Sequence, residues 1–368
     1  MVSETRLVGE FFRLVQISSP SKRERHVADY LKAKLTGMGL KVEEDEAGFE
    51  IGGDTGNLIA RFPGNGGPAI VFCAHMDTVQ PGEGIIPVLQ DGIITSQGAT
   101  VLGGDDKAGI SAILEAIQVI KEQNLAHPEI VIVFTVAEEG GLRGAQAVDV
   151  DSFGAEFAFC LDAGGPVGSV VNRGPAQNQL RASIYGRAAH AGICPEEGVS
   201  AIQIAAEAIM RTKLGRVDSE TTANIGLISG GKATNIIPDC VELEGEARSL
   251  TDAKLAAQTE HMIETLQQVA RKRGGRAEVS VQAVYPAINL AEDAPVIALT
   301  IKAAQAIGVE PQVIRTGGGS DANVLNGRGL PTANLGIGME KVHSTDEFIR
   351  VADLINLTRL LLAIVKLA

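Results

Sequence analysis

The 368-residue sequence is short of basic residues and cysteines, and it has no long apolar run. Its 32 Lys and Arg residues are outnumbered by 45 Asp and Glu residues, which gives a net charge of -13 at pH 7. Nucleic acids and anionic membranes bind cationic surfaces, so this balance argues against both as partners. A membrane-spanning helix needs roughly 20 apolar residues in succession, whereas the densest apolar stretch, residues 130–137, has the length of a strand.

The four cysteines are scattered along the chain without the spacing of a C-x-x-C pair. Two of them, Cys73 and Cys160, lie in apolar segments with the character of buried strands. Isolated core thiols are typical of proteins from a reducing compartment. The first residues also lack the apolar segment of a signal peptide. These features predict a cytoplasmic protein.

Apolar segments of strand length alternate with helical segments over the first part of the chain. Strands are predicted at residues 57–62, 69–74, 130–136 and 156–161, and helices at residues 108–122 and 142–148. The segment Ser21-Lys22-Arg23-Glu24 has the pattern of a capping box and predicts the start of another helix. The alternation predicts an α/β fold with a mostly parallel mixed sheet flanked by helices.

A second pattern begins near residue 177. Its strands are predicted at residues 179–186, 224–227, 241–248 and 277–284, and its helices at residues 200–213 and 252–272. The resulting β-α-β-β-α-β order is typical of a ferredoxin-like α+β domain. Because the first pattern resumes near residue 290, we expect a discontinuous catalytic domain, residues 1–176 and 289–368, with an inserted lid and dimerisation domain at residues 177–288.

Histidine and acidic residues occur where strands of the first pattern end. The candidates are His75, Asp105, Glu139, Asp162 and His343, and most of them stand at or after the end of a predicted strand. Ligands of such α/β sheets bind beyond the carboxyl ends of the strands. Imidazole and carboxylate groups without thiolates suit a pair of divalent ions such as Zn²⁺ with open coordination positions, which indicates catalysis.

Two neighbours of these candidates are also informative. Asp77, two residues after His75, can accept the second N–H of that imidazole, although it can also be an ordinary turn residue. Glu138 can face a water molecule while Glu139 binds metal, and burial beside another carboxylate would raise the pKa of Glu138 and make it a base. The alternative for this acidic pair is a solvated loop.

The segments that carry a family resemblance are H-M-D-T-V at 75–79, G-D-D-K-A-G at 104–109, E-E-G at 138–140 and L-D at 161–162. Together they resemble the motifs of the cocatalytic dizinc aminoacylase and carboxypeptidase-type metallopeptidase superfamily, over nearly the whole chain. The Asp105-Asp106-Lys107 run and Asp162 are most similar to its peptidase T branch.

The resemblance implies two Zn²⁺ ions per subunit, for which Co²⁺ or Mn²⁺ can substitute. The implied ligands are His75 and Asp162 for one ion, Glu139 and His343 for the other, and Asp105 as the bridge between them. The peptide bond between Asp105 and Asp106 is expected to be cis. Glu138 would be the general base that activates the bridging water, and Asp77 would orient His75.

The resemblance also implies roles for residues that are not metal ligands. His190 would stabilise the oxyanion, Asn235 would polarise the scissile carbonyl, and Arg248 would hold a substrate carboxylate. A peptide terminus would be held by the amides of Gly318, Gly319 and Ser320. The alternatives are a surface loop for His190 and a plain tight turn for the glycine segment.

These implications describe a dizinc exopeptidase that removes the N-terminal residue from short peptides, as a tripeptidase or aminopeptidase does. A dizinc carboxypeptidase, dipeptidase or N-acyl amino acid deacylase of the same superfamily is the main alternative. A non-catalytic peptide- or metal-binding protein is the second. In many relatives the histidine equivalent to His190 comes from a partner subunit, so we expect a homodimer formed through the inserted domain.

Overall fold

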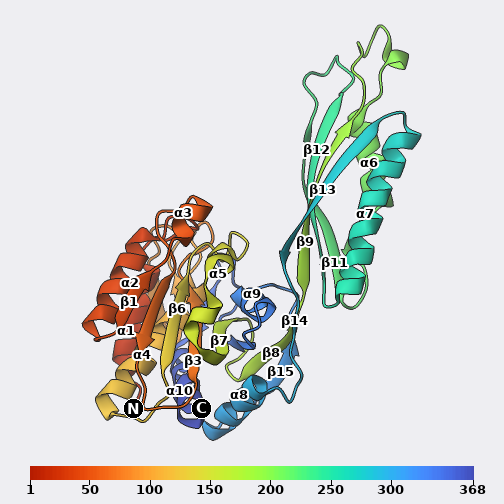
Figure 1. The fold of residues 1–368 in the computed structure, drawn as a ribbon. Coiled ribbons are helices and arrows are strands. Elements are labelled where there is room, and N and C mark those ends of the chain that lie inside the picture. The colour runs from red at the N-terminus through yellow and green to blue at the C-terminus, as the bar shows by residue number, and fades with distance from the viewer. The chain divides into compact units, whose positions relative to one another are not determined.

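The computed structural model describes residues 1–368 and separates the chain into two compact units. Unit 1 comprises Met1–Arg173, Leu290–Thr316 and Ser320–Ala368, and unit 2 comprises Gly174–Asn289 and Gly317–Gly319. Figure 1 labels the elements of both units. None of the helices is long and apolar enough to span a lipid bilayer.

Unit 1 is built on a mixed sheet whose central strands are parallel. In spatial order its strands are β1 (Lys41–Glu44), β2 (Leu58–Phe62), β6 (Ile130–Thr135), β3 (Ala69–His75), β7 (Ala155–Ala163), β16 (Thr332–Gly336) and β8 (Ser169–Gly174), with β15 (Gln312–Arg315) paired to β8. Strand β3 runs parallel to β6 and β7, and β7 runs parallel to β16. Every residue of β3 and β6 is buried, as expected for strands that are covered on both faces.

Helices cover this sheet. The long ones are α1 (Glu4–Val15), α2 (Arg25–Gly37), α4 (Gly104–Gln123), α8 (Pro295–Ala306) and α10 (Val351–Leu367), and the short ones are α3 (Ala47–Ile51), α5 (Arg143–Ala147), α9 (Asp321–Gly327) and the 3-10 turn Val150–Phe153. Helix α4 packs against α1, α10 and β3, whereas α9 packs against β7 and β16. Apolar side chains of α1, α4 and α10 join Phe72, Ile132 and Phe134 in one core. The α/β fold class predicted from the sequence is confirmed.

A small antiparallel sheet joins distant parts of unit 1. Its strands are β4 (Pro87–Gln90), β5 (Ile93–Ser96) and β17 (Phe348–Arg350), in the order β17-β5-β4. Phe348 lies opposite Thr95, and Arg350 lies opposite Ile93. This pairing anchors the segment that follows His343.

The capping box predicted at Ser21-Lys22-Arg23-Glu24 is wrong. Helix α2 begins at Arg25, and its N-cap residue, Glu24, makes no capping hydrogen bond with its side chain. Instead, Ser21 Oγ donates to Asp77 Oδ2 over 2.6 Å, and Glu24 Oε1 accepts from the Ala137 N–H over 2.9 Å. Both partners are buried polar groups that would otherwise lack hydrogen bonds, so these long-range contacts prevail over the local cap.

Unit 2 is an antiparallel sheet covered by two helices. In spatial order its strands are β10 (Gly215–Arg216), β11 (Thr221–Gly230), β12 (Cys240–Ser249), β9 (Ala176–Tyr185) and β13 (Arg276–Tyr285). Its helices are α6 (Ala201–Arg211) and α7 (Asp252–Lys272), with a 3-10 turn at Pro195–Glu197. The short strand β14 (Ile288–Asn289) comes last along the chain in this unit and is not part of the five-stranded sheet. Figure 1 shows α6 and α7 on the same side of this sheet. Leu180 and Ile184 of β9 pack in one core with Met262 and Leu266 of α7. The element order and the antiparallel sheet agree with the ferredoxin-like prediction.

Candidate metal centre

His75 is the last residue of β3, and it is 1% exposed. Its Nδ1 lies 3.0 Å from the main-chain carbonyl oxygen of Asp77 and 3.4 Å from Asp77 Oδ1. Its Nε2 lies 3.0 Å from Asp105 Oδ1 and 4.0 Å from Asp162 Oδ1. An imidazole that donates a hydrogen bond from Nδ1 keeps the lone pair of Nε2 for a metal. This ring is therefore oriented to act as a ligand beside two carboxylates.

Two adjacent aspartates begin α4, and their side chains point to different partners. The Asp105–Asp106 peptide bond is cis, as the resemblance implied. Asp105 faces both imidazoles, because its Oδ1 approaches His75 and its Oδ2 lies 3.3 Å from His343 Nε2. Asp106 is fully buried and accepts from the N–H groups of His75 and Gly109 over 3.2 and 3.1 Å. Asp105 thus has the geometry of a ligand that bridges two metal ions. Asp106 holds the end of β3 through its hydrogen bond from the His75 N–H.

The acidic pair Glu138-Glu139 follows β6 after a turn at Ala137, whose φ of 49° lies in the left-handed region. Glu139 Oε1 lies 2.9 Å from His343 Nε2. Glu138 is 7% exposed. Burial, together with the negative charges of Asp321 and Glu139, raises the pKa of the Glu138 carboxyl well above its usual range. One member of the pair therefore meets a histidine, and the other is a buried carboxylate that accepts a proton readily.

Asp77 connects His75 to this acidic pair. Its Oδ1 accepts from the Glu138 N–H over 3.0 Å, and its Oδ2 accepts from the Glu139 N–H over 3.2 Å. Burial alone would raise the pKa of Asp77, but hydrogen bonds from His75, Ser21 and the Glu138 N–H outweigh burial and lower this pKa. The ionised carboxylate therefore fixes the ends of β3 and β6 relative to each other.

Asp162 lies in β7 and is held from the neighbouring strand β16. Its N–H donates to Asn334 Oδ1 over 3.1 Å, and Asn334 Nδ2 donates back to the Asp162 carbonyl oxygen over 3.3 Å. Burial and the negative charges of Glu138 and Asp105 raise the pKa of the Asp162 carboxyl well above its usual range. Such crowding of carboxylates is relieved by protons or by metal cations.

His343 reaches the group from a loop. Its φ of 61° lies in the left-handed region, and its side chain is 53% exposed. Hydrogen bonds to Asp105 and then to Glu139 raise the pKa of the imidazole to about 10. These carboxylates therefore stabilise a positive charge at this ring, which is the position where the resemblance implies a metal.

The metal-type side chains form overlapping groups whose ligand atoms lie within 4.8 Å of one another. The groups are His75, Asp105 and Asp162; His75, Glu138 and Glu139; and Asp105, Glu139 and His343. Asp105 is common to the first and the last. Nitrogen and oxygen donors that share a carboxylate fit a pair of zinc-type ions, so the residues present agree with the implied metal pair.

Lys107, two residues after Asp105 in α4, is also buried. No role was predicted for it from the sequence. It is 1% exposed, and its Nζ donates to Ser19 Oγ and Thr78 Oγ1 over 2.9 Å each and to the Met76 carbonyl oxygen over 2.5 Å. Burial lowers the pKa of Lys107 to about 8, although the negative charge of Asp77 opposes the shift. A lysine directly before the mainly apolar residues 108–114 of α4 was a usable signal, because buried lysines require partners.

Two further buried acids were missed as well. Asp321 is 1% exposed, its Oδ2 accepts from Thr135 Oγ1, and its Oδ1 has no hydrogen-bond partner. Burial raises the pKa of Asp321 to about 6. Glu347 is 2% exposed and accepts from backbone N–H groups next to Asp105. Neither residue belongs to a local pattern that distinguishes it from a surface acid.

Of the residues predicted to contact substrate, all but Ser320 lie in unit 2, and two of them are close to each other. His190 and Asn235 are both exposed. His190 forms a bridge with Ile236, and the Ala191 N–H donates to the Asn235 carbonyl oxygen over 3.0 Å. Both residues therefore lie on paired loop segments that solvent can reach.

Arg248 of β12 already holds a carboxylate. Its Nε and Nη2 donate to the two oxygens of Glu246 over 2.9 and 3.0 Å. Hydrogen bonding to Glu246 outweighs the effect of burial and raises the pKa of this guanidinium. A substrate carboxylate must therefore compete with Glu246 or use the remaining N–H donors of Arg248.

The predicted peptide-terminus loop, Gly318-Gly319-Ser320, has internal contacts of its own. The Ser320 N–H donates to Asn323 Oδ1 over 2.9 Å, and Ser320 is the N-cap of α9. At Gly319 an added Cβ would lie 2.4 Å from the Tyr285 hydroxyl oxygen. These contacts account for Ser320 and Gly319 as parts of a tight turn. The Ser320 N–H is already hydrogen-bonded to Asn323.

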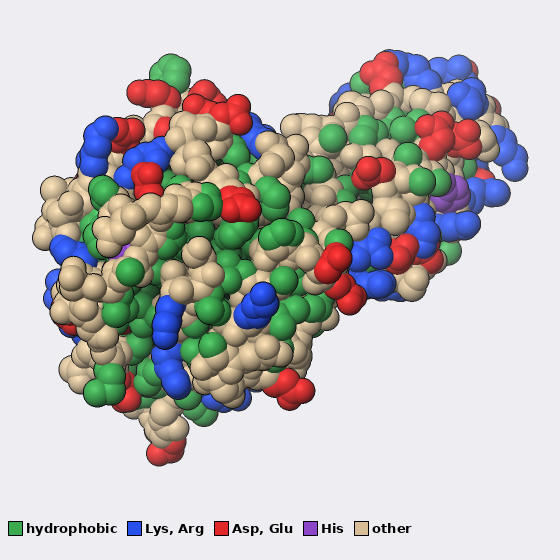
Figure 2. Space-filling model, turned by 60° about the horizontal axis from the view of Figure 1, so that its bottom comes forward, with side chains coloured by type: hydrophobic (Ala, Val, Ile, Leu, Met, Phe, Trp, Pro, Cys, Tyr) green, Lys and Arg blue, Asp and Glu red, His purple; other side chains and the backbone are tan.

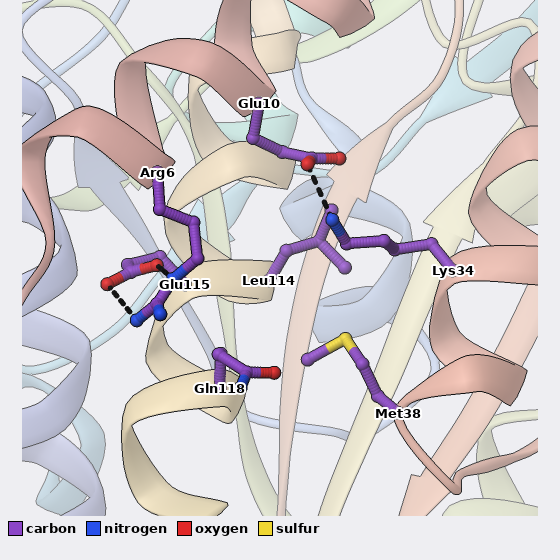
Figure 3. A pocket seen from close by; sticks show the side chains of 7 residues that line it. All are labelled: Arg6, Glu10, Lys34, Met38, Leu114, Glu115 and Gln118. Carbon is purple, nitrogen blue, oxygen red and sulfur yellow. Dashed lines mark hydrogen bonds and ion pairs between the residues drawn. The ribbon is translucent and has the colours of Figure 1, made fainter. Parts of the chain in front are cut away.

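Two depressions elsewhere in unit 1 lack this chemistry. One is a pocket of about 30 Å³ lined by Arg6, Glu10, Lys34, Met38, Leu114, Glu115 and Gln118. Figure 3 shows the ion pairs Arg6–Glu115 and Lys34–Glu10 among these side chains. A larger hollow of about 510 Å³, at the ends of α4, α8 and α10, is mostly apolar with Arg359 and Lys366 in its lining. Figure 2 shows the end of unit 1 where hydrophobic side chains gather around a few basic ones. Neither depression brings histidines and carboxylates together.

Comparison with known proteins gives consistent matches. The chain matches peptidase family M20/M25/M40 over residues 71–367. It is 30% identical to peptidase T of Vibrio cholerae over 94% of each chain. The structure of aminopeptidase PepT from Bacillus cereus is 45% identical, with a TM-score of 0.91 over 100% of this chain and 99% of that one. A tripeptidase structure from Staphylococcus aureus is 42% identical, with a TM-score of 0.95 over 100% of this chain and 98% of that one.

Proposed function

The chain belongs to peptidase family M20/M25/M40, and from that premise we propose that it is a dizinc exopeptidase that removes the N-terminal residue from short peptides. The observation that carries this proposal is the Asp105 carboxylate, which faces His75 with one oxygen and His343 with the other. The aminopeptidase and tripeptidase structures support the choice of reaction, because they are 45% and 42% identical over the whole chain.

The proposed ligands are His75 and Asp162 for one ion, Glu139 and His343 for the other, and Asp105 for both. Zinc ions held there would act as Lewis acids toward the scissile carbonyl and would lower the pKa of a water molecule. Co²⁺ and Mn²⁺ accept the same nitrogen and oxygen ligands and can substitute. Asp77 orients the His75 ring through its Nδ1, and Asn334 fixes the backbone of Asp162.

Glu138 is the proposed general base. Its carboxylate takes a proton from the attacking water and delivers that proton to the leaving amine as the C–N bond breaks. Burial raises its pKa, which favours proton uptake, and nearby bound cations would oppose this rise. The Asp77 carboxylate holds the Glu138 N–H over 3.0 Å and so keeps the base in place.

The substrate contacts are proposed for residues of unit 2 and the adjoining loop. His190 stabilises the carbonyl oxygen as it becomes negative, and Asn235 polarises it. Arg248 holds a substrate carboxylate, and Gly318 and Gly319 offer amides to a peptide terminus. All four cysteines are free thiols, which supports the cytoplasmic location that forms part of the proposal.

Replacement of Glu138 tests the base. Glu138→Gln should keep both metal ions but lose roughly 10²–10⁴-fold in kcat, because the amide cannot take the proton. Tripeptide hydrolysis and metal content by atomic emission are the measurements. Glu139→Gln is the matched control, since it removes a ligand and should lose metal. A Glu138→Gln protein with full metal content and wild-type turnover would contradict the assignment.

The adjacent aspartates give a matched pair for the bridge. Asp105→Asn should lose both ions on dialysis, because the carboxylate shared by the two imidazoles is gone. Asp106→Asn should lose stability but retain more metal, since Asp106 bonds to backbone N–H groups. Metal analysis and thermal unfolding of both variants decide the question. Equal metal loss in the two proteins, or greater loss in Asp106→Asn, argues against a bridge at Asp105.

The Arg248 clamp predicts a preference for a free C-terminus. Free tripeptides should be cleaved about tenfold faster in kcat/KM than their C-terminal amides, a modest factor because Glu246 already satisfies two guanidinium donors. Arg248→Ala should abolish this preference. Arg181→Ala is the control, since Arg181 is an exposed arginine paired with Glu244 on the same sheet. If amides and long peptides are cleaved as well as tripeptides, a broader aminopeptidase replaces the tripeptidase.

The homodimer remains part of the proposal, and an exposed strand edge supports it. Strand β10 pairs with β11 only at Thr222 and Ala223, so the rest of the outer edge of β11 lacks a neighbouring strand. Leu227 and Ile228 on that edge are 63% and 56% exposed. Unpaired apolar edges favour association.

Light scattering checks this proposal. The protein should have twice the mass of one chain, and Leu227→Lys should shift it to the monomer. Val281→Lys, on the opposite edge strand β13, is the control and should remain dimeric. A monomeric wild-type protein contradicts the dimer, and dissociation by Val281→Lys alone moves the interface to β13.

A further inference from the structure

Glu347 is a charged residue buried in the segment between His343 and β17. It is 2% exposed. Its Oε2 accepts from the N–H groups of Leu102 and Gly103 over 2.7 and 2.8 Å, and its Oε1 accepts from the Asp105 N–H over 3.2 Å. These donors lie 242 to 245 residues earlier in the chain. One carboxylate therefore joins the segments that carry Asp105 and His343.

Two glycines in segment 102–105 allow its backbone to approach the Glu347 carboxylate closely. Gly103 has a φ of 72°, in the left-handed region that favours glycine. At Gly104 an added Cβ would lie 3.0 Å from Glu347 Oε1, so the absence of a side chain there permits the close approach. Backbone N–H groups that converge on one point form a binding site for an anion, and Glu347 supplies that anion from within the chain.

Glu347 is also anchored through its own backbone. Its N–H donates to the Ser344 carbonyl oxygen over 3.2 Å. Phe348, the next residue, lies opposite Thr95 in the small sheet. Glu347, four residues after His343, is therefore fixed to the backbone of Asp105 and, through Phe348, to the small sheet.

We propose that Glu347 is a positioning residue that holds Asp105 and His343 at the separation a metal ion between them requires. The inference rests on the metal assignment of the proposed function. The N–H that Glu347 holds and the carboxylate that faces both imidazoles belong to the same residue, Asp105. A shift of this backbone would turn the carboxylate away from His343 Nε2, which now lies 3.3 Å from Asp105 Oδ2.

A purely structural role for Glu347 predicts something different. A buried anion at the start of α4 also stabilises the helix through its dipole, and its loss would lower stability without a specific effect on metal. The two roles are separated by comparing metal affinity with thermal stability in the same variant.

Glu347→Gln is the first test. A glutamine has one acceptor oxygen, so its amide N–H₂ must face at least one of the backbone donors. The affinity of the weaker metal site for Zn²⁺, measured by competition with a chromogenic chelator, should fall roughly 10- to 100-fold, as is usual when a partner of a metal ligand is lost. Added zinc should restore most of the peptidase activity, whereas KM for the peptide should change little.

Glu115→Gln is the matched control. Glu115 is also a buried carboxylate of unit 1, located on α4, and it accepts from the Ser3 N–H over 2.8 Å and from Arg6. Its loss should lower the unfolding temperature but leave zinc affinity unchanged. If Glu347→Gln and Glu115→Gln have the same zinc affinity as the wild type, the positioning role is refuted.

A second variant covers the case in which Glu347→Gln does not fold. Gly104→Ala keeps the carboxylate but places a Cβ against Glu347 Oε1, and it should weaken zinc binding in the same direction. Unchanged zinc affinity in a folded Gly104→Ala protein argues against the inference. If the wild-type protein binds no divalent metal, the proposed function fails. If the wild type and the variants bind zinc equally well, only the positioning role of Glu347 fails.

Discussion

Repulsion among buried carboxylates is the constraint on which the site depends. Asp105 at the start of α4, Glu138 after β6 and Asp162 in β7 are crowded beside His75. Two negative charges about 4 Å apart repel by about 4 kcal/mol at an effective dielectric constant of 20. Burial, together with this crowding, raises the pKa values of Glu138 and Asp162. Hydrogen bonds to Asp105 and Glu139 raise the pKa of His343 to about 10. In the proposed enzyme, metal cations relieve the same repulsion.

The chain holds these acids in place with hydrogen bonds from its backbone. Asp77 accepts from the N–H groups of Glu138 and Glu139, and Glu347 accepts from that of Asp105. In both cases a second buried carboxylate fixes the main chain of a proposed ligand or base. Lys107 adds a buried amino group whose positive charge interacts with Asp77. Rigid backbone at the strand ends is what allows repelling side chains to remain close together.

In the proposed enzyme, substrate selection would have a different physical basis from bond cleavage. Arg248 lies in unit 2 and is already paired with Glu246. If a substrate carboxylate binds there as proposed, the free energy gained would be the difference between two similar ion pairs. Such a difference is small, in contrast to the large effect of removing one partner from a desolvated pair. A preference for short peptides would then depend more on the space around the site than on the strength of the clamp.

Much of this organisation was predictable from the sequence, because hydrophobic periodicity and strand ends are local properties. The strands, the helices and the β-α-β-β-α-β insertion follow from that periodicity, and His75 and Asp162 stand out because they end buried strands. The tertiary structure alone showed which atoms meet. Ser21 and Glu24 have the pattern of a helix cap but instead bond to Asp77 and Ala137. Glu347 has no local signature, since its donors lie more than 240 residues away. Such partners are selected by the need of buried polar groups for hydrogen bonds, which depends on the packed chain and not on neighbours in sequence.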